Sequence, residues 1–218
     1  MNYNKVIIEI DNFVSKNIDI LQLLYPREGD LKYSKIINQI ITGNNLLQLK
    51  YEISNFYRFQ GMDEKQRINL LNIFDERKED IKNITDIDKT YILYCELLEK
   101  TIEATDKCQY VNTSKLMHLY NRDIPLFDNN VINFLRILNI DVRHRTKETY
   151  NHILNIYYKI NEQKNIESIK NIINIRNIIY SNVGVKHINL TKFVDTLMYS
   201  INDAKTMNTY KPLCEDHG

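Results

Sequence analysis

Residues 111–135, VNTSKLMHLYNRDIPLFDNNVINFL, carry the side chains with the clearest potential for chemistry. Lys115 lies near the expected start of one helix, and Asp128 follows 13 positions later, directly before an apolar helix. A lysine amine becomes a nucleophile when a desolvated pocket lets it lose its proton, and a nearby carboxylate can stabilise positive charge. If the two helices pack as a hairpin, we expect both groups to face one cleft.

Two helices and a tight turn must position this pair. Thr113 or Ser114 is expected to cap the first helix. Pro125 is expected to end it, because a proline disfavours helical backbone at the preceding residue. Asp128 is expected to cap the second helix, with its carboxylate at the positive end of the helix dipole. The sequence therefore predicts a helix-turn-helix hairpin near residues 113–138.

This arrangement resembles the helix-hairpin-helix DNA glycosylases, in particular their lysine-containing 8-oxoguanine branch. The similarity covers about residues 108–138, with weaker similarity in FYRFQGM (56–62) and LTKFVDTLMYS (190–200). The resemblance implies that Lys115 attacks the sugar C1′ and forms a Schiff base, and that Asp128 assists departure of a modified purine. It implies DNA as partner and no metal or other cofactor. The segment departs from the family pattern in lacking a glycine in CQYVNTSK before the lysine.

Basic and polar residues around the same segment are the candidate DNA contacts. The run RILNIDVRHRTK (136–147) places five basic residues against a single acid, and such clusters bind backbone phosphates. The complete set of predicted DNA-binding residues is Ser114, His118, Arg122, Asn129, Arg136, Arg143, His144, Arg145 and Lys147.

Two other functions stay open on the sequence. A non-catalytic helical adaptor or regulator, from a mobile element or a defence locus, would use the basic cluster as its partner surface. Arg145 and His152, with six residues between them, also resemble the paired residues of the HEPN class of dimeric helical ribonucleases.

Composition and charge exclude several classes of protein. The 218 residues carry a net charge of +1, so any nucleic-acid site must be a local patch. Cys95, Cys108 and Cys214 lack the spacing of a disulfide framework, a zinc site or an iron–sulfur cluster. No segment has about 18 consecutive apolar residues, and the N-terminus lacks the pattern of a secretion signal. We therefore expect a cytoplasmic protein without membrane contacts; its oligomeric state stays open.

Hydrophobic periodicity predicts an all-α fold. Only five glycines and three prolines occur, and apolar residues recur at three- and four-residue intervals along the chain. We expect about eight to ten helices in one domain over residues 1–205, with a flexible tail over residues 206–218. Expected caps are Asp63 and either Asn189 or Thr191. Expected core positions are Ile36, Ile37, Ile40, Ile41, Ile68, Leu71, Phe74, Ile92, Leu93, Leu97 and Ile102.

Overall fold

Every regular element in the described part of the chain is an α-helix, which confirms the predicted all-α class. The computed structural model describes residues 3–16, 28–59, 61–137, 140, 142, 145–162, 167–181 and 188–206. These ranges contain eleven helices, one more than the upper end of the expected range. They are α1 (Tyr3–Lys16), α3 (Glu28–Ile41), α4 (Lys50–Tyr57), α5 (Glu64–Glu76), α6 (Lys78–Asn83), α7 (Ile87–Thr105), α8 (Tyr110–Tyr120), α9 (Asn129–Ile137), α10 (Lys147–Glu162), α11 (Glu167–Ser181) and α12 (Leu190–Thr206). The predicted tail falls almost wholly outside the described residues.

Local capping signals set several helix starts, as the sequence predicts. Asp63 accepts a hydrogen bond from the backbone N–H of Gln66, whose side chain bonds back to the Asp63 N–H in a capping box. Asn189, rather than Thr191, caps α12, since its Oδ1 accepts from the Lys192 N–H at 3.0 Å. Residues 64–83 form two helices, α5 and α6, with a break at Arg77.

The start of α8 differs from the prediction. This helix begins at Tyr110, so Thr113 and Ser114 lie inside it rather than at its cap. Both side chains are fully buried, and Ser114 Oγ donates to the Val111 carbonyl at 2.9 Å. Their hydroxyls bond partners inside the fold. Because serine and threonine hydroxyls can also cap a helix, this pair resembles a helix start in the sequence. Lys115 consequently lies in the middle of its helix, not near its start.

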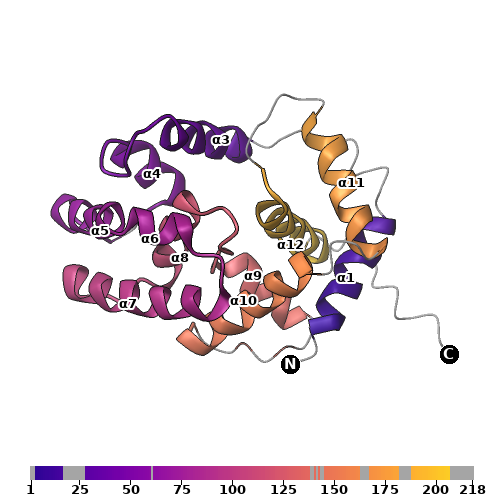
Figure 1. The fold of residues 1–218 in the computed structure, drawn as a ribbon. Helices are drawn as coiled ribbons and strands as arrows, with labels where there is room; N and C mark the ends of the chain where they lie inside the picture. The colour runs from indigo at the N-terminus through magenta and orange to yellow at the C-terminus, as the bar shows by residue number, and fades with distance from the viewer. Residues whose placement is uncertain are drawn as a thin grey trace.

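The helices form two groups joined by a central pair (Figure 1). Helices α3 to α8 make one group, in which α7 packs on both α5 and α8. Helices α1, α11 and α12 make the other, where α1 lies beside α11 although they come from opposite ends of the chain. Helix α10 packs on α7 and on α1, while α9 packs on α12. The site residues on α8, α9 and α12 therefore come from both groups.

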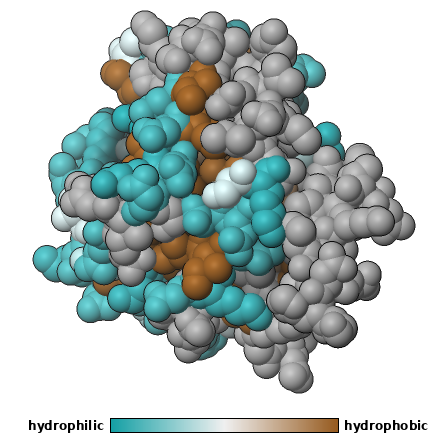
Figure 2. Space-filling model, turned by 90° about the vertical axis from the view of Figure 1, so that its right-hand side faces the viewer, coloured by the Kyte–Doolittle hydropathy of each residue, from teal (hydrophilic) through white to brown (hydrophobic). Residues whose placement is uncertain are grey.

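One contiguous apolar core runs through the described helices, from Val6 on α1 to Met198 on α12. Most expected core positions are buried, but Ile41, Ile92 and Ile102 are 55%, 56% and 37% exposed, so these three assignments were wrong. Isoleucine is abundant throughout the chain, and its presence alone does not identify the buried face of a helix. Hydrophobic side chains also reach the surface in small areas between hydrophilic ones on the face drawn in Figure 2. Such scattered exposure is ordinary.

The described helices include none with the length and apolar character needed to cross a bilayer.

Candidate active site

Lys115 projects from α8 toward the ring of Tyr57 on α4. Its Nζ lies 5.0 Å from the centre of the Tyr57 ring, a cation–π contact. The side chain is half-buried. Burial lowers the pKa of the Lys115 amine, while the nearby Asp128 carboxylate opposes that change. Lys115 is thus the kind of partly desolvated lysine from which a nucleophilic amine can form.

Asp128 caps α9, as the sequence predicts. Its Oδ1 accepts hydrogen bonds from the backbone N–H groups of Asn130 and Val131, at 2.9 and 3.1 Å. These bonds fix the carboxylate at the start of the helix. Burial and the Asp195 carboxylate raise the pKa of Asp128, and the Val131 N–H and Lys115 lower it by less.

Lys115 and Asp128 therefore lie within electrostatic range of each other in a partly buried region. They do not meet through a packed hairpin, because α8 packs mainly on α7 and α9 packs mainly on α12. The connection between the two helices is instead fixed by the Phe127 N–H, which donates to Ser114 Oγ at 2.8 Å. A lowered amine pKa and a raised carboxyl pKa bring the two groups closer in acidity, and this favours proton transfer between them.

A second lysine–aspartate pair lies on α12 beside the first. Lys192 Nζ and Asp195 Oδ2 are 2.7 Å apart, and their side chains are only 14% and 8% exposed. For Lys192, burial lowers the pKa, but the Coulombic attraction and hydrogen bond of Asp195 reverse that effect and leave the pKa raised. Lys192 also lies 5.6 Å from the Tyr33 ring centre. Two amines and two carboxylates thus share this interior site.

His118 and Ser114, both predicted to bind DNA, are fully buried. His118 Nδ1 lies 2.6 Å from the Ile124 carbonyl oxygen, and its Nε2 lies 2.8 Å from the Tyr33 hydroxyl. Because a carbonyl can only accept, Nδ1 carries the hydrogen and Nε2 accepts from Tyr33. The prediction that these two side chains bind DNA is therefore wrong. They bond α8 to its neighbours and are not accessible to a nucleic acid.

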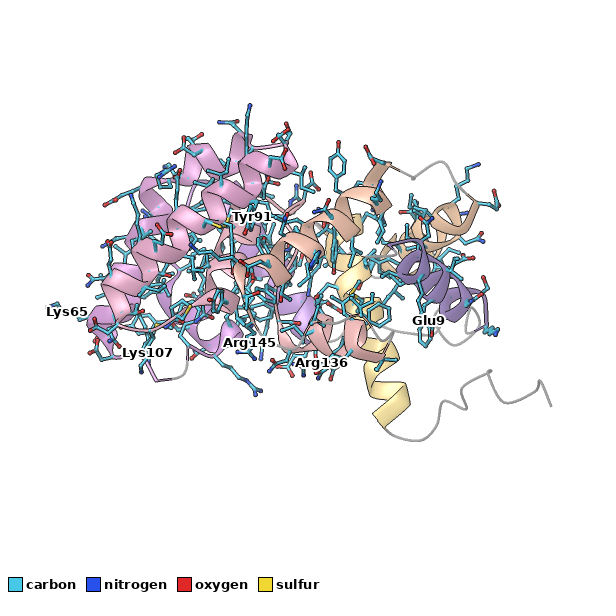
Figure 3. All side chains as sticks on the ribbon, turned by 90° about the horizontal axis from the view of Figure 1, so that it is seen from below. Glu9, Lys65, Tyr91, Lys107, Arg136 and Arg145 are labelled. Carbon is cyan, nitrogen blue, oxygen red and sulfur yellow. The ribbon has the colours of Figure 1, made fainter. Side chains whose placement is uncertain are left out.

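Arg145 and Asn129 lie together near Lys115. The Arg145 guanidinium donates a hydrogen bond to Asn129 Oδ1 at the start of α9, and its charge contributes to lowering the Lys115 pKa, though less than burial does. Both side chains are exposed. Figure 3 shows Arg145 and Arg136 on one edge of the molecule, with Lys107 farther along it.

The remaining predicted DNA-binding residues are dispersed. Arg136 is exposed and donates to the Val142 carbonyl at 3.2 Å, and Lys147 pairs with Glu99 at 2.7 Å. Arg122 is half-buried, and its carbonyl accepts from Asn189 at 2.6 Å. Arg143 and His144 lie outside the described residues.

The ribonuclease alternative depends on Arg145 and His152. His152 is half-buried on α10, whereas the Arg145 guanidinium is bonded to Asn129 on α9. The structure thus links Arg145 to the Lys115 site. Within the described ranges, no cluster of three or more His, Cys, Asp or Glu side chains is placed to hold a metal ion.

Sequence reasoning did not assign a role to Tyr57, Lys192 or Asp195. The segments that contain them, FYRFQGM and LTKFVDTLMYS, had only a weak similarity to the glycosylase pattern. The available signal was a lysine and an aspartate three positions apart in one helix, since that spacing places both on one face.

Comparison of the chain with protein-family models, with curated protein sequences and with solved structures found no match. The fold and the site therefore define the class only as an all-α protein with a partly buried lysine–carboxylate site.

Proposed function

We propose that this protein is a DNA glycosylase-like enzyme that removes a modified base with Lys115 as the amine nucleophile. The observation that carries the proposal is the electrostatic interaction of Lys115 with Asp128: a partly desolvated amine with a lowered pKa lies within electrostatic range of a carboxylate held at a helix N-terminus. An amine nucleophile and an adjacent anion are the two groups that displacement at a sugar carbon requires.

In the proposed reaction, the Lys115 ammonium first passes a proton to Asp128 or to water. The neutral amine attacks C1′ of the deoxyribose, the bond from C1′ to the base nitrogen breaks, and the base leaves with the electron pair and takes up the proton that Lys115 released, so that Asp128 is left ionised. Ionised Asp128 stabilises the positive charge that develops on the sugar. Opening of the C1′–O4′ bond and loss of the amine proton then give a Schiff base, from which strand cleavage by β-elimination can follow.

DNA would reach the site across the edge that carries Arg145. This side chain is exposed, is joined to Asn129 and lies within electrostatic range of Lys115. A guanidinium there can hold a phosphate next to the extruded nucleotide. Extrusion is needed because the target sugar and base of a duplex are otherwise inaccessible to a partly buried amine.

Borohydride trapping tests the proposal. Purified protein is incubated with duplexes that carry an abasic site, 8-oxoguanine or uracil, and borohydride reduces any Schiff base to a stable covalent adduct. We expect an adduct with the wild-type chain and none with Lys115→Ala. Lys65→Ala, which removes an exposed lysine on α5, should form the adduct at the wild-type yield.

The absence of an adduct on every duplex, or an adduct that survives Lys115→Ala, would refute the proposal. The first of these results would favour the adaptor alternative.

A further inference from the structure

Two residues that interact with Lys115, Tyr57 and Asp195, carry buried polar atoms without hydrogen-bond partners. Among the described residues, the Tyr57 hydroxyl, Asp195 Oδ1 and Thr191 Oγ1 are buried and form no hydrogen bond. Tyr57 and Asp195 are only 7% and 6% exposed. Buried polar atoms are nearly always hydrogen-bonded, because a buried donor or acceptor without a partner destabilises the fold. Several such atoms in one place indicate a binding site.

Tyr57 and Asp195 belong to the same space. The Tyr57 ring lies under the Lys115 ammonium, and the Asp195 carboxylate acts electrostatically on both Lys115 and Tyr57. Asp195 and Thr191 are four residues apart on α12, so they share one helix face. Asp195 Oδ2 is occupied by Lys192, which leaves Oδ1 as the open acceptor.

The two open atoms have complementary hydrogen-bonding roles. Burial raises the pKa of Tyr57 well above its usual value, so its hydroxyl keeps its proton and can donate. A carboxylate oxygen can only accept. Together they offer one donor and one acceptor beside the nucleophile.

We propose that Tyr57 and Asp195 determine base specificity by binding a lactam edge, in which an N–H donor lies next to a carbonyl acceptor. Asp195 Oδ1 accepts the ring N–H, and the Tyr57 hydroxyl donates to the adjacent carbonyl oxygen. This inference rests on the proposed function. Hypoxanthine, uracil and guanine-type bases present such an edge, whereas adenine turns an unprotonated ring nitrogen toward the carboxylate. A base without the N–H would leave Asp195 Oδ1 buried without a hydrogen-bond donor, and sites of this kind reject such analogues strongly.

Tyr57→Phe is the sharpest variant for this inference. It keeps the ring under Lys115 and removes only a hydroxyl that has no partner in the free protein. We expect base release from a hypoxanthine duplex to slow at least tenfold in single-turnover kinetics. The adduct yield on an abasic duplex should stay within twofold of wild type, and Tm should be unchanged or raised. Tyr94→Phe is the matched control, since its hydroxyl bonds the Tyr110 carbonyl at 3.2 Å; it should lower Tm and leave base release unchanged.

Substrate variants test the same edge from the other side. Wild-type protein should release hypoxanthine at least tenfold faster than N1-methylhypoxanthine, in which a methyl group replaces the N–H. Asp195→Asn should reduce the ratio of the two release rates, and circular dichroism checks that this variant is folded. If Asp195→Asn does not fold, the kinetics of Tyr57→Phe test the inference instead.

The outcomes separate the two proposals. No adduct from the wild-type chain on abasic DNA refutes the Lys115 chemistry itself. Two other results would refute only the specificity assigned to Tyr57 and Asp195. One is an adduct on abasic DNA without release of any lactam base. The other is an adduct together with a rate of base release that Tyr57→Phe does not change.

Discussion

At the scale of single residues, His118 shows how a polar side chain can have a structural role. Its neutral ring bridges the Tyr33 hydroxyl on α3 and the Ile124 carbonyl after α8. Burial lowers the pKa of His118 to about 3. The bridge therefore requires the uncharged imidazole, and it fixes the turn that leads to Asp128.

Acid should weaken the fold through His118. The unfolded chain takes up a proton on this histidine below its ordinary pKa of about 6.5, while the folded chain does not until about pH 3. The unfolded state thus binds more protons in that window, and stability falls as pH falls through it. Between pH 7 and pH 5 we expect a loss of about 2 kcal/mol from this one group.

Urea unfolding of wild type and His118→Asn at both pH values measures this contribution. The difference in the free energy of unfolding between pH 7 and pH 5 should be smaller in His118→Asn than in wild type. In His152→Asn it should equal the wild-type difference. Asp128 acts in the opposite direction, since its raised pKa favours the folded state on acidification, but it affects wild type and variant alike. An equal pH dependence in wild type and His118→Asn would contradict the assignment.

The sequence predicted that Lys115 and Asp128 lie near each other, but it did not predict which residues surround them. Lys115 and Asp128 are close along the chain, so the intervening turn could be interpreted locally. His118 bonds a tyrosine 85 positions away, and no local pattern contains that contact. Thr113 or Ser114 was expected to cap α8, although both lie on its buried face. Asp195 was also overlooked: it is a buried acid, and its burial is set by tertiary packing.

At the scale of helices, α9 combines a structural cap with a chemical group in one residue. Asp128 Oδ1 holds two backbone N–H groups at the helix start. The same carboxylate interacts with Lys115. A helix end is a rigid support, and this favours a reproducible position for the carboxylate.

Asp128→Ser should separate these two roles. A serine hydroxyl can still cap α9, so we expect the free energy of unfolding to stay within about 0.5 kcal/mol of wild type, whereas Asp128→Ala should lose about 1–2 kcal/mol. Both variants lack the anion, so both should slow base release by at least a hundredfold. Urea unfolding and single-turnover kinetics provide the two measurements. Equal stability of the serine and alanine variants would show that the cap contributes little, and wild-type kinetics in either would remove Asp128 from the mechanism.

At the scale of the whole molecule, the site depends on packing between segments far apart in the sequence. Helix α12 carries Lys192 and Asp195 and packs on α9, and α1 packs on α10, α11 and α12. Helix type and approximate number followed from periodicity. The pairing of α1 with α11 did not, because an amphipathic face does not specify which partner covers it.

A substitution at the far end of the core should therefore weaken the site helices. Ile10 on α1 is fully buried, and Ile8 on the same helix is 58% exposed. Ile10→Ala should lower the free energy of unfolding by about 2–5 kcal/mol, and Ile8→Ala should change it by less than about 0.5 kcal/mol. If the contiguous core unfolds as one unit, the free energy of opening measured by hydrogen exchange should fall in Ile10→Ala. The fall should be the same for the best-protected amides of α8 and α9 as for those of α1. Loss of protection confined to α1 and α11 would instead mean that the terminal helices open independently, and the Lys115 site would then keep its stability in Ile10→Ala.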